Sequence, residues 1–332
     1  MTETENRIVR VKGLGGPEVL RIDQELPSPP ADDEVSIRVR AIGLNRADVM
    51  FRRGTYLQKP VFPSRLGFEA AGEVIATGGS VQRFRPGDRV SVIPGAPLAA
   101  HGTCADWVNI PASHVIPSSK GLDDQRAAAL LMSYLTPYGA LVEIRRLARG
   151  QWIVITAANS TVGLAAIDIA RAIGARPIAT VLGEALREPM LHAGAEAVIV
   201  IDREDLGERL QEIAPEGIHA AFDAVGGPHV ETLAQALRPH GTIVIHGALS
   251  PEPTPFPLKT ALRKSLSLRG YLYTEVTEAP DVLARAREFL ERGIAAGAIS
   301  PRIDRTYDLN DIVEAHRYLE TGTQFGKIVV TT

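Results

Sequence analysis

Cysteine is almost absent from this sequence, because Cys104 is the only one among 332 residues. A single thiol excludes an internal disulfide and any cysteine-rich zinc site. Long apolar runs are also missing: no stretch approaches the ~18 uninterrupted apolar residues of a membrane span. The first residues, MTETENRIVRVKG, are polar and contain no apolar segment of signal-peptide length. These absences predict a cytoplasmic, reducing environment and no membrane partner.

The sequence also has no large excess of charge of either sign. The chain has 36 Lys and Arg against 39 Asp and Glu, a net charge of -3, and no long basic run. Nucleic-acid-binding surfaces need clustered basic residues, so no nucleic-acid partner is expected. The 45% hydrophobic and 23% charged composition is ordinary for a soluble globular protein. The length is sufficient for two domains with sizeable cores.

Two halves of the chain follow different patterns. Up to about residue 124, short Val- and Ile-rich stretches are separated by turn-forming residues, which predicts a β-rich domain resembling a partly closed barrel. From residue 125, apolar strands alternate with helical segments, which predicts an α/β domain with a doubly wound parallel sheet of six strands. We expect helices at residues 47–53, 162–173, 185–193, 206–213, 229–237 and 279–292.

The segment AANSTVG, residues 157–163, lies where the first strand of the second half meets its helix. Dinucleotide-binding turns usually carry three glycines spaced G-x-G-x-x-G, and these places fall here on Ala158, Ser160 and Gly163. Ser160 is also a good helix N-cap, and backbone N–H groups at a helix start bind anions. An α/β turn that binds nothing is the alternative. The strand–turn–helix context favours a nicotinamide dinucleotide, with Ser160, Thr161, Val162 and Gly163 beside the pyrophosphate.

The next strand ends in IATVLGEALR, where NAD-binding chains usually place an acidic residue. Val181 and Leu182 occupy that place, and Glu184 follows slightly too far along. Arg187 is the one nearby cation that could contact the 2′-phosphate of NADP. The alternative interpretation of Arg187 is a solvated helix residue.

Seven segments, taken together, resemble the medium-chain dehydrogenase/reductase superfamily, and most closely its zinc-free quinone oxidoreductase branch. They are GLNRADVMFRRGTY, FEAAGEVIATG, RPGDRV, LTPYGALVE, AANSTVGLAAIDIARAIGA, FDAVGG and GKIVVT. The resemblance implies a GroES-like catalytic domain (1–124), a Rossmann cofactor-binding domain (125–273) and a C-terminal return (274–332) that completes the catalytic domain. It also implies a homodimer.

Zinc members of the superfamily hold their catalytic metal with Cys, His and Cys, and these places correspond here to Asn45, Phe68 and Met132. These three side chains do not form a competent zinc ligand set. The eight histidines are scattered, and no pair has ligand spacing. We therefore expect no metal.

Without a Lewis acid, the chemistry that the resemblance implies is conjugate reduction. Tyr56 resembles the tyrosine that serves as the presumed proton donor in enoyl-thioester reductases of the superfamily; water is the other possible donor. A loop tyrosine that caps the barrel is the alternative. Asn45 and Thr136 match family positions near the nicotinamide, although either could simply satisfy backbone groups.

The resemblance further implies cofactor contacts at Thr180, Val225, His246 and Gly247. It favours NADP(H) and does not exclude NAD(H). However, the residues that grip the 2′-phosphate in bacterial quinone oxidoreductases correspond here to Leu186, Ile201 and Gly322, and a second active-site tyrosine is replaced by Met50.

The function that these patterns predict is zinc-independent, NAD(P)H-dependent reduction of quinones or α,β-unsaturated carbonyl compounds. The substrate is expected to be small and hydrophobic. Reduction of an enoyl thioester is a close alternative. A non-redox binding or scaffold protein that has lost its cofactor is the alternative of another class.

Overall fold

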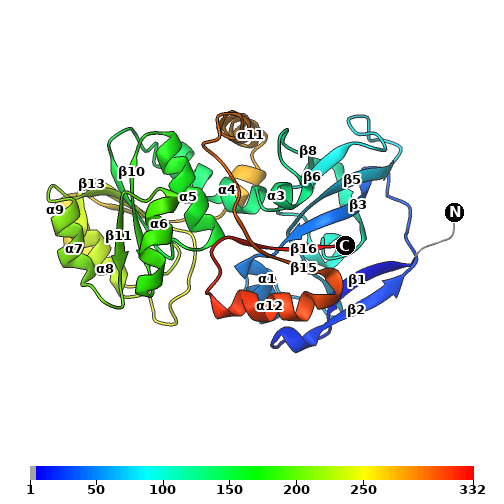
Figure 1. Ribbon diagram of the computed structural model, residues 1–332, viewed down its shortest axis with the longest axis horizontal. Coiled ribbons are helices and arrows are strands. Elements are labelled where there is room, and N and C mark those ends of the chain that lie inside the picture. The colour runs from blue at the N-terminus through cyan, green and yellow to red at the C-terminus, as the bar shows by residue number, and fades with distance from the viewer. Residues whose placement is uncertain (1–4) are drawn as a thin grey trace. The chain divides into compact units, whose positions relative to one another are not determined.

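The computed structural model describes residues 5–332, which form two compact units (Figure 1). Unit 1 combines the chain up to Met132 with its last segment, Pro301–Thr332, and unit 2 is the continuous segment Ser133–Ser300. The sequence predicted the same general plan with boundaries at residues 124 and 273. The structure places both boundaries further along the chain.

Unit 2 is built on six parallel strands: β9 (Trp152–Ile155), β10 (Arg176–Val181), β11 (Ala197–Val200), β12 (Ile218–Asp223), β13 (Leu237–Ile245) and β14 (Ser267–Gly270). Their order in the sheet is β11-β10-β9-β12-β13-β14. The chain therefore starts in the middle, runs outward to β11, and returns to the middle at β12 before it runs outward again. This is the doubly wound Rossmann order, and the predicted six-stranded sheet is confirmed.

Helices cover both faces of this sheet. The helices of unit 2 are η3 (Tyr138–Ile144), α5 (Thr161–Ala172), η4 (Glu184–Leu186), α6 (Arg187–Ala193), α7 (Leu206–Ile213), α8 (His229–Ala236), α9 (Leu258–Lys264), α10 (Thr274–Thr277) and α11 (Pro280–Ala295). Figure 1 shows α5 and α6 on one face and α7, α8 and α9 on the other. The strands are buried apolar runs, as is usual when both faces of a parallel sheet are covered: Val154, Ile178 and Ile199 are fully buried.

Unit 1 is rich in strands: β1 (Asn6–Val11), β2 (Leu20–Glu25), β3 (Glu34–Gly43), β4 (Ser64–Arg65), β5 (Glu69–Thr77), β6 (Arg89–Val92), β7 (Trp107–Pro111), β8 (Val115–Pro117), β15 (Ile303–Asp308) and β16 (Lys327–Thr331). A seven-stranded sheet follows the path β15-β16-β3-β5-β6-β8, and β7 also pairs with β3. Strand β3 can hold three partners because β7 pairs with its first half and β16 with its second. Strands β2, β1 and β4 form a smaller sheet.

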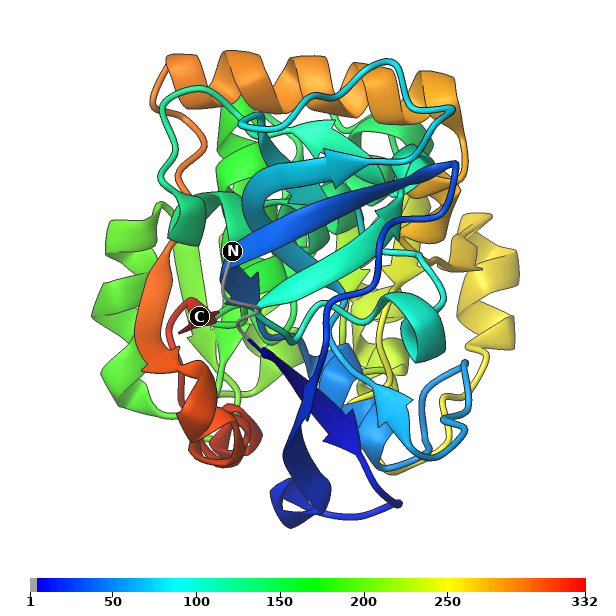
Figure 2. The ribbon, with the colours of Figure 1, turned by 90° about the vertical axis from the view of Figure 1, so that its right-hand side faces the viewer.

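The helices of unit 1 are short: η1 (Pro17–Val19), α1 (Arg46–Arg52), α2 (Leu98–His101), η2 (Ala112–His114), α3 (Asp124–Ala128), η5 (Leu309–Asp311) and α12 (Ile312–Thr321), and α4 (Leu131–Pro137) crosses the unit boundary. In Figure 2 the red C-terminal segment lies beside the blue strands of the same unit. The C-terminal segment Pro301–Thr332 thus belongs to unit 1.

This return begins later than residue 274, because α11 belongs to unit 2. Arg285 of α11 forms an ion pair with Glu143 at 2.9 Å. Phe289 packs its ring against Tyr138, with 5.4 Å between the ring centroids. Only the segment from Pro301 onward joins unit 1.

The expected helices at 47–53, 162–173, 206–213 and 229–237 match α1, α5, α7 and α8 within one residue. Helix α9 was missed, because it lies in a segment that the sequence predicted as a loop. It follows four prolines, and its Leu258 and Leu262 are 57% and 72% exposed, so it lacks a buried apolar face. Across residues 5–332, no helix is both long and apolar enough to span a bilayer.

Candidate functional site

The centre of the parallel sheet defines where a ligand would bind in unit 2. In doubly wound sheets the ligand crevice lies at the carboxyl ends of the two neighbouring strands from which the chain winds in opposite directions. These strands are β9 and β12, which pair through Val154 and Ala221. The segments that leave them, residues 156–160 and 224–228, therefore form the core of the candidate site.

The turn after β9 is tied to the neighbouring strand. The N–H of Ala158 donates a hydrogen bond to the carbonyl of Thr180 at 3.0 Å, and Ala157 adopts a left-handed φ of 47°. Ser160 is the N-cap of α5, and its Oγ accepts a hydrogen bond from the N–H of Gly163 at 3.1 Å. The side chain at the second glycine place is therefore turned toward its own helix. This arrangement fits an anion at the start of α5, beside Thr161 and Val162.

Gly163 allows a close approach between the helix and the turn. A Cβ at this position would lie 2.6 Å from both the Cα and the carbonyl oxygen of Ala158, which is closer than non-bonded atoms approach one another. Any side chain here would push the start of α5 away from the strand. The third glycine of the fingerprint thus has its usual packing role, as predicted.

A buried carboxylate that the sequence analysis did not single out fixes the other side of the crevice. Asp223, at the end of β12, accepts hydrogen bonds from the Thr156 hydroxyl at 2.7 Å and from the N–H groups of Val225 and Gly226, both at 3.0 Å. Its Oδ1 also lies 3.1 Å from His229 Nε2. Burial acts to raise the pKa of Asp223, but the hydrogen bonds from His229 and Thr156 outweigh it and lower that pKa. An ionised Asp223 therefore locks the two segments together.

The residues Val225, His246 and Gly247 lie at the same edge of the sheet. The backbone N–H of His246 donates to the Asp223 carbonyl at 2.9 Å, and its ring stacks on Phe222 with 3.9 Å between centroids. Burial lowers the pKa of His246 to about 4, so its imidazole is neutral at pH 7. A Cβ on Gly247 would lie 2.4 Å from the Ala224 carbonyl oxygen. The structure thus brings together three of the predicted cofactor contacts.

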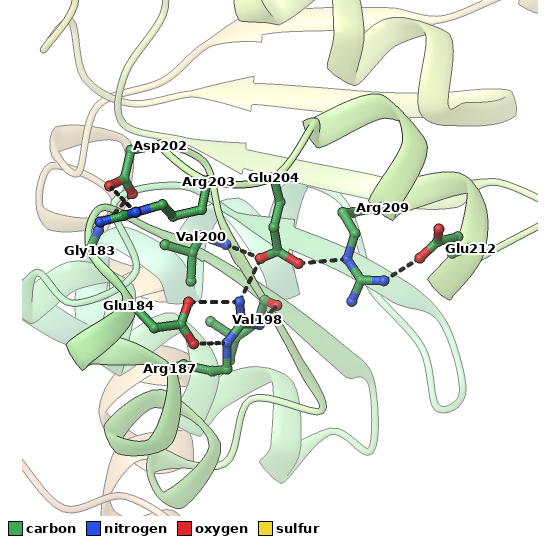
Figure 3. A network of polar contacts seen from close by, with 10 residues as sticks. All are labelled: Gly183, Glu184, Arg187, Val198, Val200, Asp202, Arg203, Glu204, Arg209 and Glu212. Atoms are coloured by element: carbon green, nitrogen blue, oxygen red, sulfur yellow. Dashed lines mark hydrogen bonds and ion pairs between the residues drawn. The ribbon is translucent and has the colours of Figure 1, made fainter.

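Thr180 and Arg187 behave differently from those three. Thr180 is buried in β10 and supports the turn through its backbone. Arg187 lies in a network of charged side chains at the ends of β10 and β11, shown in Figure 3. Its guanidinium bonds to both oxygens of Glu184, at 2.5 and 3.0 Å, and to Glu204 at 2.8 Å. The predicted phosphate ligand is therefore already paired with two carboxylates.

In unit 1, two of the three places that the resemblance assigns to zinc ligands contact a buried ion pair. Lys327 Nζ binds Glu69 Oε1, and each side chain is only 1% exposed. Asn45 accepts from Lys327 Nζ at 2.7 Å and donates to Glu69 at 3.2 Å, while the N–H of Met132 donates to the second Glu69 oxygen at 2.9 Å. Phe68, the third place, precedes Glu69 in the chain. This set does not fit zinc, because the side chains of Asn45, Phe68 and Met132 are not usual zinc ligands and the one carboxylate, on Glu69, is already paired with Lys327.

The remaining candidate catalytic residues are placed as follows. Tyr56 lies in the loop after α1, and its ring meets the Phe68 ring edge-on, with 5.3 Å between centroids. Its backbone N–H is held by the Met50 carbonyl at 3.1 Å. Thr136 is buried in α4 and belongs to unit 2, whereas Asn45 and Tyr56 belong to unit 1. Within residues 5–332, no group of three or more His, Cys, Asp or Glu side chains is arranged to hold a metal ion.

Asp223 and Lys327 were missed although both lie in quoted motifs, FDAVGG and GKIVVT. The signal was an acidic or basic residue inside an otherwise apolar strand, where burial of a charge is costly unless it is paired. Their partners, Thr156 and Glu69, are distant in sequence, so no local pattern predicts these pairs.

Two family models match the chain: the alcohol dehydrogenase GroES-like domain over residues 31–125 and the zinc-binding dehydrogenase domain over residues 161–288. Quinone oxidoreductase 1 of Escherichia coli is 33% identical over 331 residues, which cover 95% of this chain and 97% of that protein. A quinone oxidoreductase of Pseudomonas aeruginosa is 32% identical over 335 residues, covering 97% and 98%. The chain thus belongs to the medium-chain dehydrogenase/reductase superfamily, in its quinone oxidoreductase-like branch.

Solved structures agree with this assignment. The Escherichia coli quinone oxidoreductase in complex with NADPH matches with a TM-score of 0.90 and 31% identity, covering 98% of this chain and all of that one. An NAD-dependent alcohol dehydrogenase matches with a TM-score of 0.88 and 29% identity, covering 98% and 99%. The relatives therefore include proteins described with either nicotinamide cofactor.

Proposed function

We propose that this chain is a zinc-independent reductase that uses NAD(P)H to reduce quinones or the activated double bond of α,β-unsaturated carbonyl compounds. The observation that carries the proposal is the buried cluster of Lys327, Glu69 and Asn45, because Asn45 occupies one of the places that the resemblance assigns to a zinc ligand. Without a metal to polarise an isolated carbonyl, a conjugated acceptor is favoured, because hydride adds to carbon while the charge moves to an oxygen that needs only a proton or a hydrogen bond.

The crevice of unit 2 supports the cofactor part of this proposal. NAD(P)H, when bound, supplies the hydride. The start of α5, with Ser160, Thr161 and Val162, would hold the pyrophosphate, and the glycine at position 163 keeps that helix against the turn. Gly247 lets the end of β13 pack closely against the Ala224 backbone at this edge, and the neutral His246 would add no charge beside the nicotinamide.

Tyr56 would supply the proton, with water as the other donor. A phenol has an ordinary pKa of about 10 and stays protonated at neutral pH, so it can donate its proton to a developing enolate. The contact with Phe68 orients the ring. Asn45 serves this site as a positioning residue, because both ends of its amide are bonded within the ion-pair cluster. Thr136 remains the proposed neighbour of the nicotinamide.

A substrate panel tests this proposal. Metal-free protein is mixed with NADH or NADPH and with a quinone, an enone, an enoyl thioester or a simple aldehyde, and cofactor oxidation is followed by absorbance. We expect turnover with the quinone or the enone and none with the aldehyde. Turnover of the thioester alone would favour the enoyl-thioester alternative. Failure to bind either cofactor would favour a non-redox protein.

A homodimer in the cytoplasm completes the proposal. Strand β14 ends the parallel sheet, and the nearby Leu258, Leu262 and Leu272 are 57%, 72% and 40% exposed. Pairing of β14 with a second copy would satisfy its free edge and cover apolar surface. Light scattering should give twice the mass of 35.7 kDa; a monomer at micromolar concentration would contradict this part. The lone, buried Cys104 supports a reducing compartment.

A further inference from the structure

The carboxyl ends of β10 and β11 carry a network of acidic and basic side chains in two neighbouring groups, one around Asp202 and one around Arg187 (Figure 3). The ends of the strands are tied together, because the N–H of Gly183 donates to Asp202 at 2.7 Å and the N–H of Ile201 donates to the Val181 carbonyl at 3.0 Å. In a Rossmann unit the end of this second strand is where the adenosine ribose of the cofactor is recognised. The network therefore lies where the 2′-phosphate that distinguishes NADPH from NADH would be placed.

Arg187 has little capacity left for a phosphate. Of the five N–H donors of a guanidinium, four are engaged: Nε and one Nη2 hydrogen by Glu184, the other by Glu204, and one Nη1 hydrogen by the Val198 carbonyl at 3.1 Å. Glu204 is itself fixed, because the N–H of Val200 donates to it at 2.7 Å and Arg209 lies 2.8 Å away. The hydrogen bonds to its two carboxylates raise the pKa of Arg187.

Glu184 has the complementary properties. Its side chain is 59% exposed, although Arg187 holds it in a two-point contact. A carboxylate has about four acceptor sites, so two remain for ribose hydroxyl groups. The hydrogen bond from Arg187 lowers the pKa of Glu184, which keeps it ionised. Beside it, Leu182 and Ile201 are 66% and 43% exposed, an apolar surface suited to an adenine ring.

The network also has an unfavourable charge for a phosphate. It contains four carboxylates, on Glu184, Asp202, Glu204 and Glu212, against three guanidinium groups, on Arg187, Arg203 and Arg209. Each guanidinium in it has a carboxylate partner. A 2′-phosphate would add nearly two negative charges to a site whose guanidinium groups are already paired with carboxylates.

We infer that this chain selects NADH over NADPH, with Glu184 accepting the adenosine ribose hydroxyls and Arg187 and Glu204 acting as the positioning residues that hold it. The inference rests on the proposed function, because it concerns the same cofactor crevice. It reverses the role that the sequence suggested for Arg187, which orients a carboxylate here and does not bind a phosphate.

Arg203 is the group most able to oppose this preference. Its side chain is 70% exposed, and its contact with Asp202 is 3.7 Å long. A swing of this side chain could supply a cation for a 2′-phosphate. An Arg203→Ala variant therefore belongs in the test.

Calorimetric titration with NADH and with NADPH in matched low-salt buffer measures the preference directly. For the unaltered protein we expect NADH to bind about ten-fold tighter than NADPH, or more. This affinity ratio of NADH to NADPH should shrink as salt screens the repulsion between the 2′-phosphate and the carboxylates. Glu184→Gln should lower the ratio by about ten-fold. Arg187→Ala should weaken NADH several-fold without weakening NADPH. Glu188→Gln, which removes an exposed charge from α6, the helix of Arg187, should leave the affinity ratio unchanged.

Several results would overturn the inference. Equal or tighter binding of NADPH by the unaltered protein would do so while leaving the proposed function intact. Selective loss of NADPH binding in Arg187→Ala or Arg203→Ala would show that a cation reads the 2′ position. An equal change in both affinities, with a lowered thermal midpoint, would reduce Glu184 to a structural role. Absence of binding for both cofactors would overturn the inference and the proposed function together.

Discussion

Single residues show how far a family likeness carries over to one chain. Tyr56 and Asn45 were both candidates for the reaction, but the structure gives them different surroundings. The Tyr56 ring stands edge-on to Phe68 in a loop, whereas the Asn45 amide is bonded to Lys327, Glu69 and the Gly43 carbonyl. Tyr56 is therefore the residue on which a test of proton donation should act.

Replacement of Tyr56 by Phe removes the hydroxyl and keeps the ring that packs on Phe68. Loss of a general acid typically costs 10²–10⁴-fold, so kcat on an enone should fall by about that range, while cofactor affinity stays the same. On a quinone the fall should be smaller, since the reduced oxygen is less basic and can take its proton from water. Steady-state rates and a cofactor titration check this. An unchanged kcat on every accepted substrate would remove Tyr56 from the mechanism.

At the scale of elements, the turn between β9 and α5 connects local sequence to function. Its cap, its close packing at Gly163 and its tie to β10 all follow from a few residues. The start of α5 is thereby held rigidly at the sheet's carboxyl edge. The next test asks whether the cofactor lies on this helix.

Ser160→Asp tests that placement. Aspartate caps helices as well as serine does, so α5 should persist, but its negative charge would lie at the same helix N-terminus as the pyrophosphate and would repel it. We expect cofactor affinity to fall several-fold or more with little change in the thermal midpoint. Ser160→Ala is the control: it should cost about 1 kcal/mol of stability through the lost cap and leave the charge unaltered. Unchanged affinity in Ser160→Asp would mean that the cofactor does not lie on α5.

Helix α12 carries a buried histidine with a predictable pH effect. His316 is fully buried, and neither ring nitrogen has a hydrogen-bond partner among residues 5–332. Burial, with the nearby Arg52 charge, lowers its pKa to about 3. In the unfolded chain the histidine has a pKa of about 6.5, so it binds a proton more readily there than in the folded protein. The stability that depends on a neutral His316 is therefore fully present above pH ~6.5 and is lost as the pH falls toward 3.

Thermal or urea unfolding between pH 8 and pH 4 checks this effect. The free energy of unfolding should fall by up to about 1.4 kcal/mol per pH unit from this group on acidification. His316→Leu lacks the titrating ring. As the pH falls, the free energy of unfolding of the variant should therefore decrease less than that of the unaltered protein. A constant difference would show that His316 is protonated, or reaches water, in the folded state.

The sequence predicted those elements that have a clear period and clear ends. Helix α7 matched residue for residue because Asp205 caps it and its apolar residues recur at helical spacing. Helix α9 was missed because it buries little, and the unit boundary at Ser300 was missed because it depends on contacts of α11 with η3. In the site, Gly163 was predictable from a local motif. The partners of Asp223, Lys327 and Arg187 were not, because pairing between distant charges depends on the folded chain.

At the scale of the whole molecule, the proposal of a reductase that works without a metal rests on one feature in each unit: a charged cluster in unit 1 and a crevice in unit 2. Strand β16 supplies Lys327, β5 supplies Glu69, and Asn45 joins them at the start of α1. These elements come from both ends of the chain, so the C-terminal return contributes the cationic member of the cluster. The central claim is therefore that activity needs the nicotinamide cofactor and no zinc.

Metal analysis combined with chelation tests that claim most directly. The purified protein is assayed for zinc by elemental analysis, and its rate with a reduced nicotinamide cofactor and the best quinone or enone is measured before and after dialysis against a strong chelator, and again after zinc is added. We predict far less than one zinc per chain and an unchanged rate at every step. Zinc near one per chain, or a rate that is lost on chelation and restored by zinc, would contradict the claim.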